Sequence, residues 1–239
     1  MFDKIIEDTS KVIVGNLDKI KLTLAAIISE GSILIEDYPG AGKTTLAKAL
    51  TSSLGLNFKR IQFTSDLLPS DVLGFNILSN DKLKFQKGPI FTNIVLADEL
   101  NRGSPKAQSA FLEAMEEKNV TIDGESYNLP EPFFVIATQN PMDTSGTSSL
   151  PDSQLDRFMI SYSLSDLDQK EKILMLKKKI SFSNSASEPI NWSQINDKKN
   201  EITIKDEIYE YVVEIEQIIK SLGQNIYISA RCMKQIIDL

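Results

Sequence analysis

The sequence predicts an α/β fold in which a parallel sheet is covered by helices on both faces. Five short apolar runs, at residues 33–36, 58–63, 94–97, 133–138 and 159–162, alternate with segments of helical periodicity. Strands buried on both faces read as continuous apolar runs, and strands that alternate with helices are typical of parallel sheets. From about residue 165 only helical patterns follow, which predicts a smaller helical unit after the sheet.

Several helices are predicted around these strands. Residues 1–11 and 17–29 have apolar positions at helical spacing ahead of the first strand. A further helix is expected near residues 105–117, because Ser104 is a suitable N-cap and Pro105 suits the first helical position. After it, residues 119–129 predict a β-hairpin whose tight turn contains Asp123 and Gly124.

The last third of the chain contains three predicted segments. Residues 166–180 predict a lysine-rich helix, and residues 181–203 are polar and rich in Ser and Asn, which predicts a linker or a loose loop. Residues 206–222 predict an amphipathic helix. Its apolar stripe consists of Ile208, Tyr211, Val212, Ile215, Ile218, Ile219 and Leu222.

Composition limits the classes of function. The chain has 239 residues, 41% of them apolar, and a net charge of -7, with a sequence pI near 4.8; this acidic balance disfavours nucleic-acid binding. One cysteine, Cys232, excludes an intramolecular disulfide, and the lack of histidine excludes the common zinc sites. The acidic N-terminus does not resemble a signal peptide and no apolar run is long enough to span a membrane, so we expect a cytoplasmic protein.

A phosphate-binding loop is predicted directly after the first strand. Residues 37–44 read DYPGAGKT, between the apolar run 33–35 and a helix. Backbone N–H groups of such a loop converge on phosphates at the positive end of the helix, while Lys43 would reach the outer phosphates and the Thr44 hydroxyl would hold Mg²⁺. Asp37 stands where the usual pattern has its first glycine. The loop residues expected to bind nucleotide are Pro39, Gly40, Ala41, Gly42, Lys43, Thr44 and Thr45.

Polar side chains end two later core strands. Residues 94–97 are followed by Asp98 and Glu99, which we assign to Mg²⁺ and to the general base that activates water for attack on the γ-phosphate. Two acids after a strand are common in turns, but a phosphate-binding loop some 50 residues upstream favours the catalytic interpretation. Asn140 ends the strand at 133–138 and could hold the attacking water; Asn140 before a proline also suits a turn, and the two interpretations are compatible.

Further motifs follow in a fixed order through the predicted core. They are IQFT at 61–64 with DLLPSD at 66–71, GPIF at 88–91, LADELNR at 96–102, QSAFLEAMEE at 108–117, ATQNP at 137–141, and LP at 150–151 with QLDRF at 154–158. In order and spacing, this set resembles the MoxR-type AAA+ ATPases over residues 12–160, and more weakly to the end of the chain.

The resemblance implies more than the residues alone do. It implies an AAA+ P-loop NTPase core at residues 1–164 with strand order 5-1-4-3-2, a helix-2 insert at 67–91, a pre-sensor hairpin at 119–129 and a helical lid at 165–239. It implies ATP hydrolysis with Mg²⁺ in a ring, usually a hexamer. By resemblance, Val14 and Gly15 border the adenine, Asn140 is sensor 1, Arg157 is the arginine finger that reaches the neighbouring subunit, and Arg231 is the sensor 2 arginine.

For the two arginines and for Arg102, ordinary roles remain open. Arg157 and Arg231 could be solvated surface residues, and for Arg102 we prefer a salt bridge with neighbouring acids to a phosphate contact. Family members normally continue with more lid helices after the position of Arg231, so we expect a short lid or a fragment.

The resemblance also implies a chaperone-like role in protein maturation or metal insertion, often with a von Willebrand factor A-domain partner. The alternatives are a subunit of a metal-chelatase complex, a nucleic-acid remodeller, and a nucleotide-dependent scaffold without turnover. The acidic residues Glu117, Asp123 and Glu125 on the hairpin argue against the nucleic-acid alternative.

Overall fold

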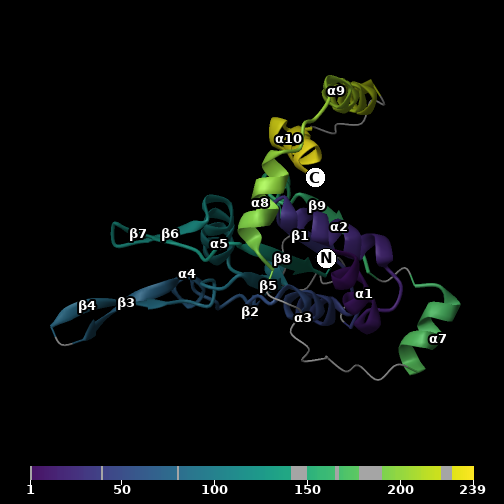
Figure 1. Ribbon diagram of the computed structural model, residues 1–239. Coiled ribbons are helices and arrows are strands. Elements are labelled where there is room, and N and C mark those ends of the chain that lie inside the picture. The colour runs from purple at the N-terminus through teal and green to yellow at the C-terminus, as the bar shows by residue number, and fades with distance from the viewer. Residues whose placement is uncertain are drawn as a thin grey trace.

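The computed structural model describes residues 2–38, 40–79, 81–140, 150–164, 167–177, 190–221 and 228–239. Its centre is a five-stranded parallel sheet in the order β2-β5-β8-β1-β9 (Figure 1). The strands are β1 (Ile33–Glu36), β2 (Phe58–Gln62), β5 (Ile94–Asp98), β8 (Phe134–Gln139) and β9 (Ile160–Tyr162). Numbered along the chain as core strands 1 to 5, they lie in the order 5-1-4-3-2, which confirms the expected topology.

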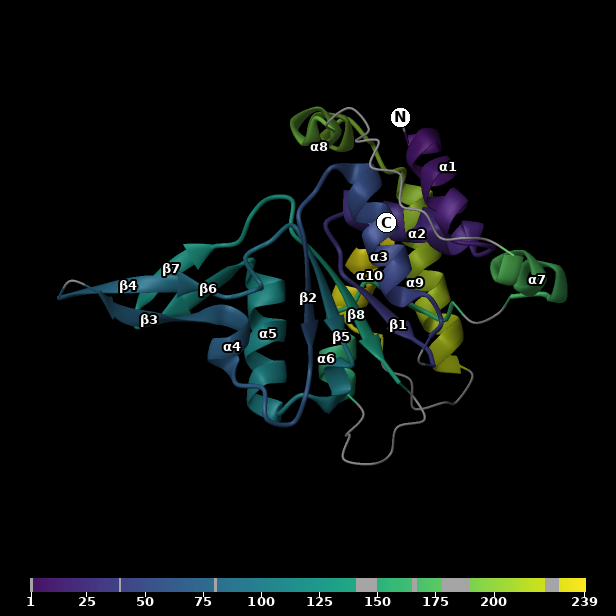
Figure 2. The same cartoon turned by 90° about the horizontal axis from the view of Figure 1, so that it is seen from below.

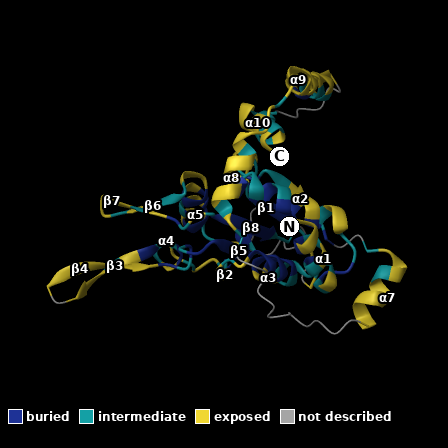
Figure 3. Ribbon diagram, viewed as in Figure 1, coloured by how far each residue is buried: buried dark blue, intermediate teal, exposed yellow. Residues whose placement is uncertain are grey.

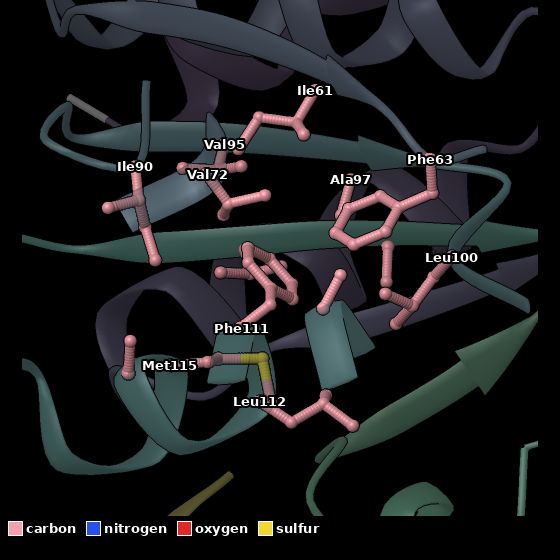
Figure 4. Close-up of a cluster of buried hydrophobic side chains, with 14 of the residues drawn as sticks. Ile61, Phe63, Val72, Ile90, Val95, Ala97, Leu100, Phe111, Leu112 and Met115 are labelled. Carbon is pink, nitrogen blue, oxygen red and sulfur yellow. The ribbon is translucent and has the colours of Figure 1, made fainter. Parts of the chain in front are cut away.

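Helices cover both faces of the sheet. One face packs against α1 (Phe2–Val12), α2 (Leu17–Ile28) and α3 (Lys43–Leu54), and the other against α5 (Pro105–Glu117), as Figure 2 shows. Side chains alternate between the two cores: Ile33 and Ile35 face the α1–α3 side, while Leu34 faces the α5 side. On the α5 side, Phe63 and Phe111 pack edge to face with ring centroids 5.3 Å apart (Figure 4). The two layers hold the strand ends in register.

Polar residues follow the carboxyl ends of three adjacent strands. β1 continues into the loop that begins at Asp37, β5 ends at Asp98, and β8 ends at Gln139, next to Asn140. The 3-10 helix η1 (Leu100–Arg102) follows β5, and α6 (Asp152–Leu155) precedes β9. Ligands of open parallel sheets bind at this edge.

Two β-hairpins project together from the α5 side (Figure 1). Residues 67–91 contain α4 (Pro69–Leu73) and the antiparallel pair β3 (Gly74–Ser79) and β4 (Lys82–Lys87). The expected hairpin at 119–129 is present as β6 (Asn119–Ile122) and β7 (Glu125–Asn128). Phe85 stacks on Tyr127 with centroids 4.1 Å apart, and Asn76 donates a hydrogen bond to Asp123 at 2.7 Å, so the hairpins support each other.

The polar segment at 181–203 was expected to be loose, and for its second half this was wrong. Helix α8 (Trp192–Asn200) begins there, with the Asn191 side chain accepting a hydrogen bond from the Gln194 N–H at 3.3 Å. Ile195 is buried, and Trp192 packs against the α1–α3 side of the core. Two apolar contacts and an N-cap outweigh the polar composition. The lysine-rich helix is present as α7 (Gln169–Lys177), and residues 178–189 lie outside the described part.

The last two helices are α9 (Asp206–Ser221) and α10 (Ala230–Asp238). Sequence analysis predicted α9 but assigned no helix to the α10 segment, where the Ser229 hydroxyl caps the helix by accepting from the Cys232 N–H at 2.9 Å. On the α9 stripe, Val212 is buried while Ile208, Tyr211 and Ile218 are exposed; Leu222 lies outside the described residues. Figure 3 shows the contrast between this exposed helix and the buried sheet.

Candidate functional site

The loop after β1 has the backbone shape of a phosphate cradle. Gly40 and Gly42 adopt left-handed φ angles of 87° and 91°, which favour glycine, and α3 begins at Lys43. A Cβ added at either glycine would meet nothing within 4 Å, so backbone conformation rather than crowding selects glycine here. The turn directs N–H groups toward the start of a helix, an arrangement that binds anions. Pro39 lies outside the described residues.

A pocket of about 320 Å³ opens at this loop. It brings together most of the residues that the sequence nominated from three separate strand ends. Its lining residues are Gly40, Gly42, Lys43, Thr44, Thr45, Arg60, Asp98, Glu99 and Asn140. Ala41, which belongs to the same loop, instead packs against the α1–α3 core.

Asp98 is held by hydrogen bonds to both carboxylate oxygens. The Thr138 hydroxyl donates to Oδ1 at 2.6 Å. Arg60 donates to Oδ2 from Nε at 2.9 Å and from Nη2 at 2.6 Å. The Asp98 side chain is only 12% exposed, whereas that of Arg60 is 49% exposed. The carboxylate is therefore fixed, while its cationic partner borders solvent.

Glu99 is positioned by its backbone and by two donors. It adopts a left-handed φ of 54°, and its N–H donates to the Thr138 hydroxyl at 2.9 Å. Its Oε2 accepts from Gln62 Nε2 at 2.8 Å and from Arg102 Nη1 at 2.9 Å. The salt bridge preferred for Arg102 from sequence is therefore confirmed. Thr138, on β8, orients both acids of β5.

Lys43 extends across the loop toward the acids. Its Nζ donates to the Asp37 carbonyl at 2.8 Å. Partial burial lowers the pKa of Lys43 below its ordinary value, and the nearby charges of Asp98, Asp37 and Glu99 oppose that shift. The ammonium group thus lies in the pocket, bonded to a loop carbonyl and within reach of the charges of three acids.

Asp37 has a structural role that its place in the motif did not suggest. Its carboxylate is buried and accepts from the N–H of Tyr38 at 2.8 Å and from that of Leu164 at 2.7 Å. The carbonyl of Leu164 accepts from Asn16 Nδ2 at 3.1 Å. Asp37 therefore ties the phosphate-binding loop to the segment after β9, and through it to the loop after α1.

Val14 and Gly15 lie on that neighbouring loop and do not line the pocket. Val14 is buried, and a Cβ at Gly15 would come within 2.8 Å of Glu171 and Leu167 side-chain atoms. Gly15 also has a left-handed φ of 68°. The left-handed backbone therefore favours a glycine at this position, and a side chain here would also displace the ends of the Glu171 and Leu167 side chains.

Arg157 and Arg231 lie together at a second location, and neither lines the pocket. Both bind the Glu116 carboxylate at the end of α5: Arg157 Nη1 at 2.8 Å from Oε2, and Arg231 through Oε1. Arg231 also contacts Asp156, whose other oxygen accepts from Ser229 Oγ at 2.6 Å. The two arginines nominated separately from sequence thus form one cluster with a shared acid.

The pocket residues suit a magnesium ion that is also bound by phosphates. Thr44 and Asp98 supply hydroxyl and carboxylate oxygens, the hard donors that Mg²⁺ prefers. The described residues contain no cluster of three or more His, Cys, Asp or Glu side chains that could hold a metal by themselves. A divalent ion here would need further oxygen ligands, which a nucleotide triphosphate provides.

Sequence reasoning missed Arg60 and Gln62, which bind the two acids from β2. The signal available was their position: Arg60, on β2, and Gln62, at its end, are two residues apart and share one face, next to the strand that carries Asp98. A polar pair on one face of a core strand, two residues apart, could have been nominated for the site.

Comparisons with known proteins agree with this geometry. Residues 32–160 match the family described as "ATPase family associated with various cellular activities (AAA)". The uncharacterized protein YeaC of Bacillus subtilis is 45% identical over 225 residues, which cover 91% of this chain and 70% of YeaC. Chaperone MoxR1 of Mycobacterium tuberculosis is 40% identical over 159 residues, covering 66% of this chain and 42% of that protein.

A solved structure extends the comparison to the whole chain. The crystal structure of a "putative ATPase" from Cytophaga hutchinsonii superposes with a TM-score of 0.86 at 35% identity, covering 99% of this chain and 77% of that one. Among the described residues, no helix is both long and apolar enough to cross a membrane. Motif order, strand order, pocket and relatives converge, and the chain belongs to the MoxR family of AAA+ ATPases.

Proposed function

We propose that this protein binds ATP with Mg²⁺ in the pocket at the β1, β5 and β8 strand ends and hydrolyses it. The observation that carries the proposal is the convergence of a glycine loop, a lysine, a threonine, two acids and an asparagine on one pocket. The loop N–H groups and Lys43 bind the phosphates, and Thr44 and Asp98 hold Mg²⁺. The ion supplies charge neutralisation to the triphosphate.

Glu99 acts as the general base in this proposal, and Asn140 orients the water. Gln62 and Arg102 both donate to Oε2 of the Glu99 carboxylate and restrain the side chain. In this proposal Oε1 is the oxygen that accepts the proton of the attacking water. Lys43, partly buried, places its positive charge where negative charge accumulates on the phosphates.

Arg157 completes a neighbouring subunit's site rather than its own. Within one chain it lies with Arg231 and Glu116, apart from the pocket lining. An arginine that stabilises a phosphoryl transition state has to reach the phosphates. In a ring, which we propose to be a hexamer, the arginine cluster of one subunit would face the pocket of the next subunit. Arg231 would then act on the same neighbouring pocket as Arg157.

The working role that we propose is chaperone-like remodelling during protein maturation or cofactor insertion. One relative, of which this chain spans 42%, carries the name chaperone. A von Willebrand factor A-domain protein is the partner class that we propose. The hairpin at 119–129 offers little for nucleic acid, since Lys118 is paired with Glu30.

The test is the ATPase rate per subunit over a wide range of protein concentration, with Mg²⁺ present. If Arg157 acts on the neighbouring site, the specific rate rises with concentration and Arg157→Ala lowers it by about a hundredfold or more. Lys106→Ala, which removes an exposed cation from α5, serves as the control and leaves the rate unchanged.

Two results would contradict parts of this proposal. A measurable rate that stays constant with concentration refutes action between subunits. Nucleotide binding without any turnover at any concentration favours the scaffold alternative.

A further inference from the structure

Arg60 is the pocket residue for which the proposed reaction has no role. It projects from β2, one of the two edge strands, where it lies opposite Leu96 of β5, two residues before Asp98. Its guanidinium makes two hydrogen bonds to a single oxygen, Asp98 Oδ2. A cation from the protein is therefore already bound to the carboxylate that is assigned to the metal.

The side chains of Asp98 and Arg60 differ in how far they can move. Asp98 is fixed by Thr138 through its other oxygen and is nearly buried. The Arg60 side chain is about half exposed and borders solvent, so it can rotate away without opening the core. The carboxylate is thus a fixed acceptor, and the guanidinium is an exchangeable donor.

Arg60 also orients a second residue of the site. The same Nη2 that binds Asp98 donates to Gln62 Oε1, so the amide presents its Nε2 to Glu99. Asp98, Arg60, Gln62 and Glu99 form a continuous chain of hydrogen bonds. Arg60 and Gln62 therefore link Asp98 Oδ2 to the Glu99 carboxylate.

We propose that Arg60 competes with Mg²⁺ for the Oδ2 oxygen of Asp98, which Thr138 holds in place through the other oxygen. This inference rests on the proposed function, because it requires nucleotide and metal to bind in this pocket. Two cations at one partly buried oxygen repel each other, so the charge of Arg60 would oppose Mg²⁺ binding there. Arg60 thereby sets the Mg²⁺ concentration that the site requires.

The test measures metal dependence by binding rather than by turnover. A fluorescent, non-hydrolysable ATP analogue is titrated with Mg²⁺ for the wild type and for Arg60→Met, which retains length but not charge. We expect the Mg²⁺ midpoint to fall by about fivefold in Arg60→Met, because Mg²⁺ no longer has to displace a half-exposed ion pair of modest strength. Lys59→Met is the matched control, because Lys59 is an exposed cation on the opposite face of the same strand and should leave the midpoint unchanged.

Arg60→Lys distinguishes competition from loss of structure. It keeps a positive charge but cannot reproduce the two guanidinium bonds, so its midpoint should lie between those of the wild type and Arg60→Met. Affinity for the analogue in EDTA should be the same for all four proteins.

The outcomes separate this inference from the proposed function. An Arg60→Met midpoint equal to that of the wild type overturns the competition. Weaker binding of Arg60→Met in EDTA also overturns it, because Arg60 would then be a phosphate ligand. Failure of the wild type to bind the analogue, with or without Mg²⁺, refutes the proposed function itself.

Discussion

Replacing Asp37 tests whether the phosphate-binding loop depends on a buried carboxylate in place of its first glycine. Asp37 is 1% exposed and accepts two backbone hydrogen bonds, from Tyr38 and from Leu164. A hydrogen bond to a charged acceptor contributes about 1.5–3 kcal/mol. The Leu164 N–H is buried and would be left without this acceptor, whereas the Tyr38 N–H is partly reachable by water.

We therefore expect Asp37→Ala to lower the free energy of unfolding by about 3 kcal/mol. Asp37→Asn keeps one acceptor oxygen and the volume of the side chain, and should lose about half as much. Urea unfolding followed by circular dichroism measures both. Glu113→Gln, on the exposed side of α5, controls for the loss of one negative charge.

Nucleotide affinity adds a second readout for the same variants. Because Asp37 joins the loop to Leu164, Asp37→Ala should weaken binding of the ATP analogue as well as the fold. The reasoning is refuted if Asp37→Ala unfolds at the same urea concentration as the wild type. It is also refuted if Asp37→Asn is the more damaging of the two.

Two further predictions follow from other contacts. Glu99→Gln should keep affinity for the ATP analogue while hydrolysis falls by about a hundredfold or more, because the amide still accepts hydrogen bonds but cannot take a proton; an unchanged rate, measured beside Glu113→Gln, would remove Glu99 from the catalytic role. Burial raises the pKa of Tyr162 to about 12, with the hydrogen bond to Thr23 opposing it. The unfolded chain releases this proton near pH 10, whereas the folded chain keeps it up to about pH 12. The contribution of Tyr162 to the free energy of unfolding is therefore fully present below pH 10 and decreases as the pH rises from 10 to about 12. Relative to Tyr162→Phe, the wild type should lose about 1 kcal/mol between pH 8 and pH 11; parallel urea midpoints across that range would contradict the shift.

The sheet could be predicted because the sequence signal for each central strand lies within the strand itself. The three central strands, β1, β5 and β8, are short apolar runs, which is the pattern expected of strands buried on both faces. The second half of the 181–203 segment could not be predicted in the same way. Its helix α8 is stabilised by Trp192 and Ile195 packing on distant residues of the core, and by one cap. Such contacts are not visible in a polar local composition.

The site shows the same division at the level of single residues. Lys43, Asp98 and Glu99 occur in short motifs, and the order of these motifs was enough to predict that the three residues share one pocket. Arg60 is separated from Asp98 by 38 positions, and only the parallel register of β2 on β5 joins them. The pairing of Arg157 with Arg231 depends on α10 reaching Glu116. Motifs therefore identify the groups that we propose to act on the nucleotide, whereas the groups that restrain them are set by strand register and helix docking. For this reason the ion pair of Arg60 with Asp98 and the cluster of Arg157 with Arg231 are what the structure adds to the sequence.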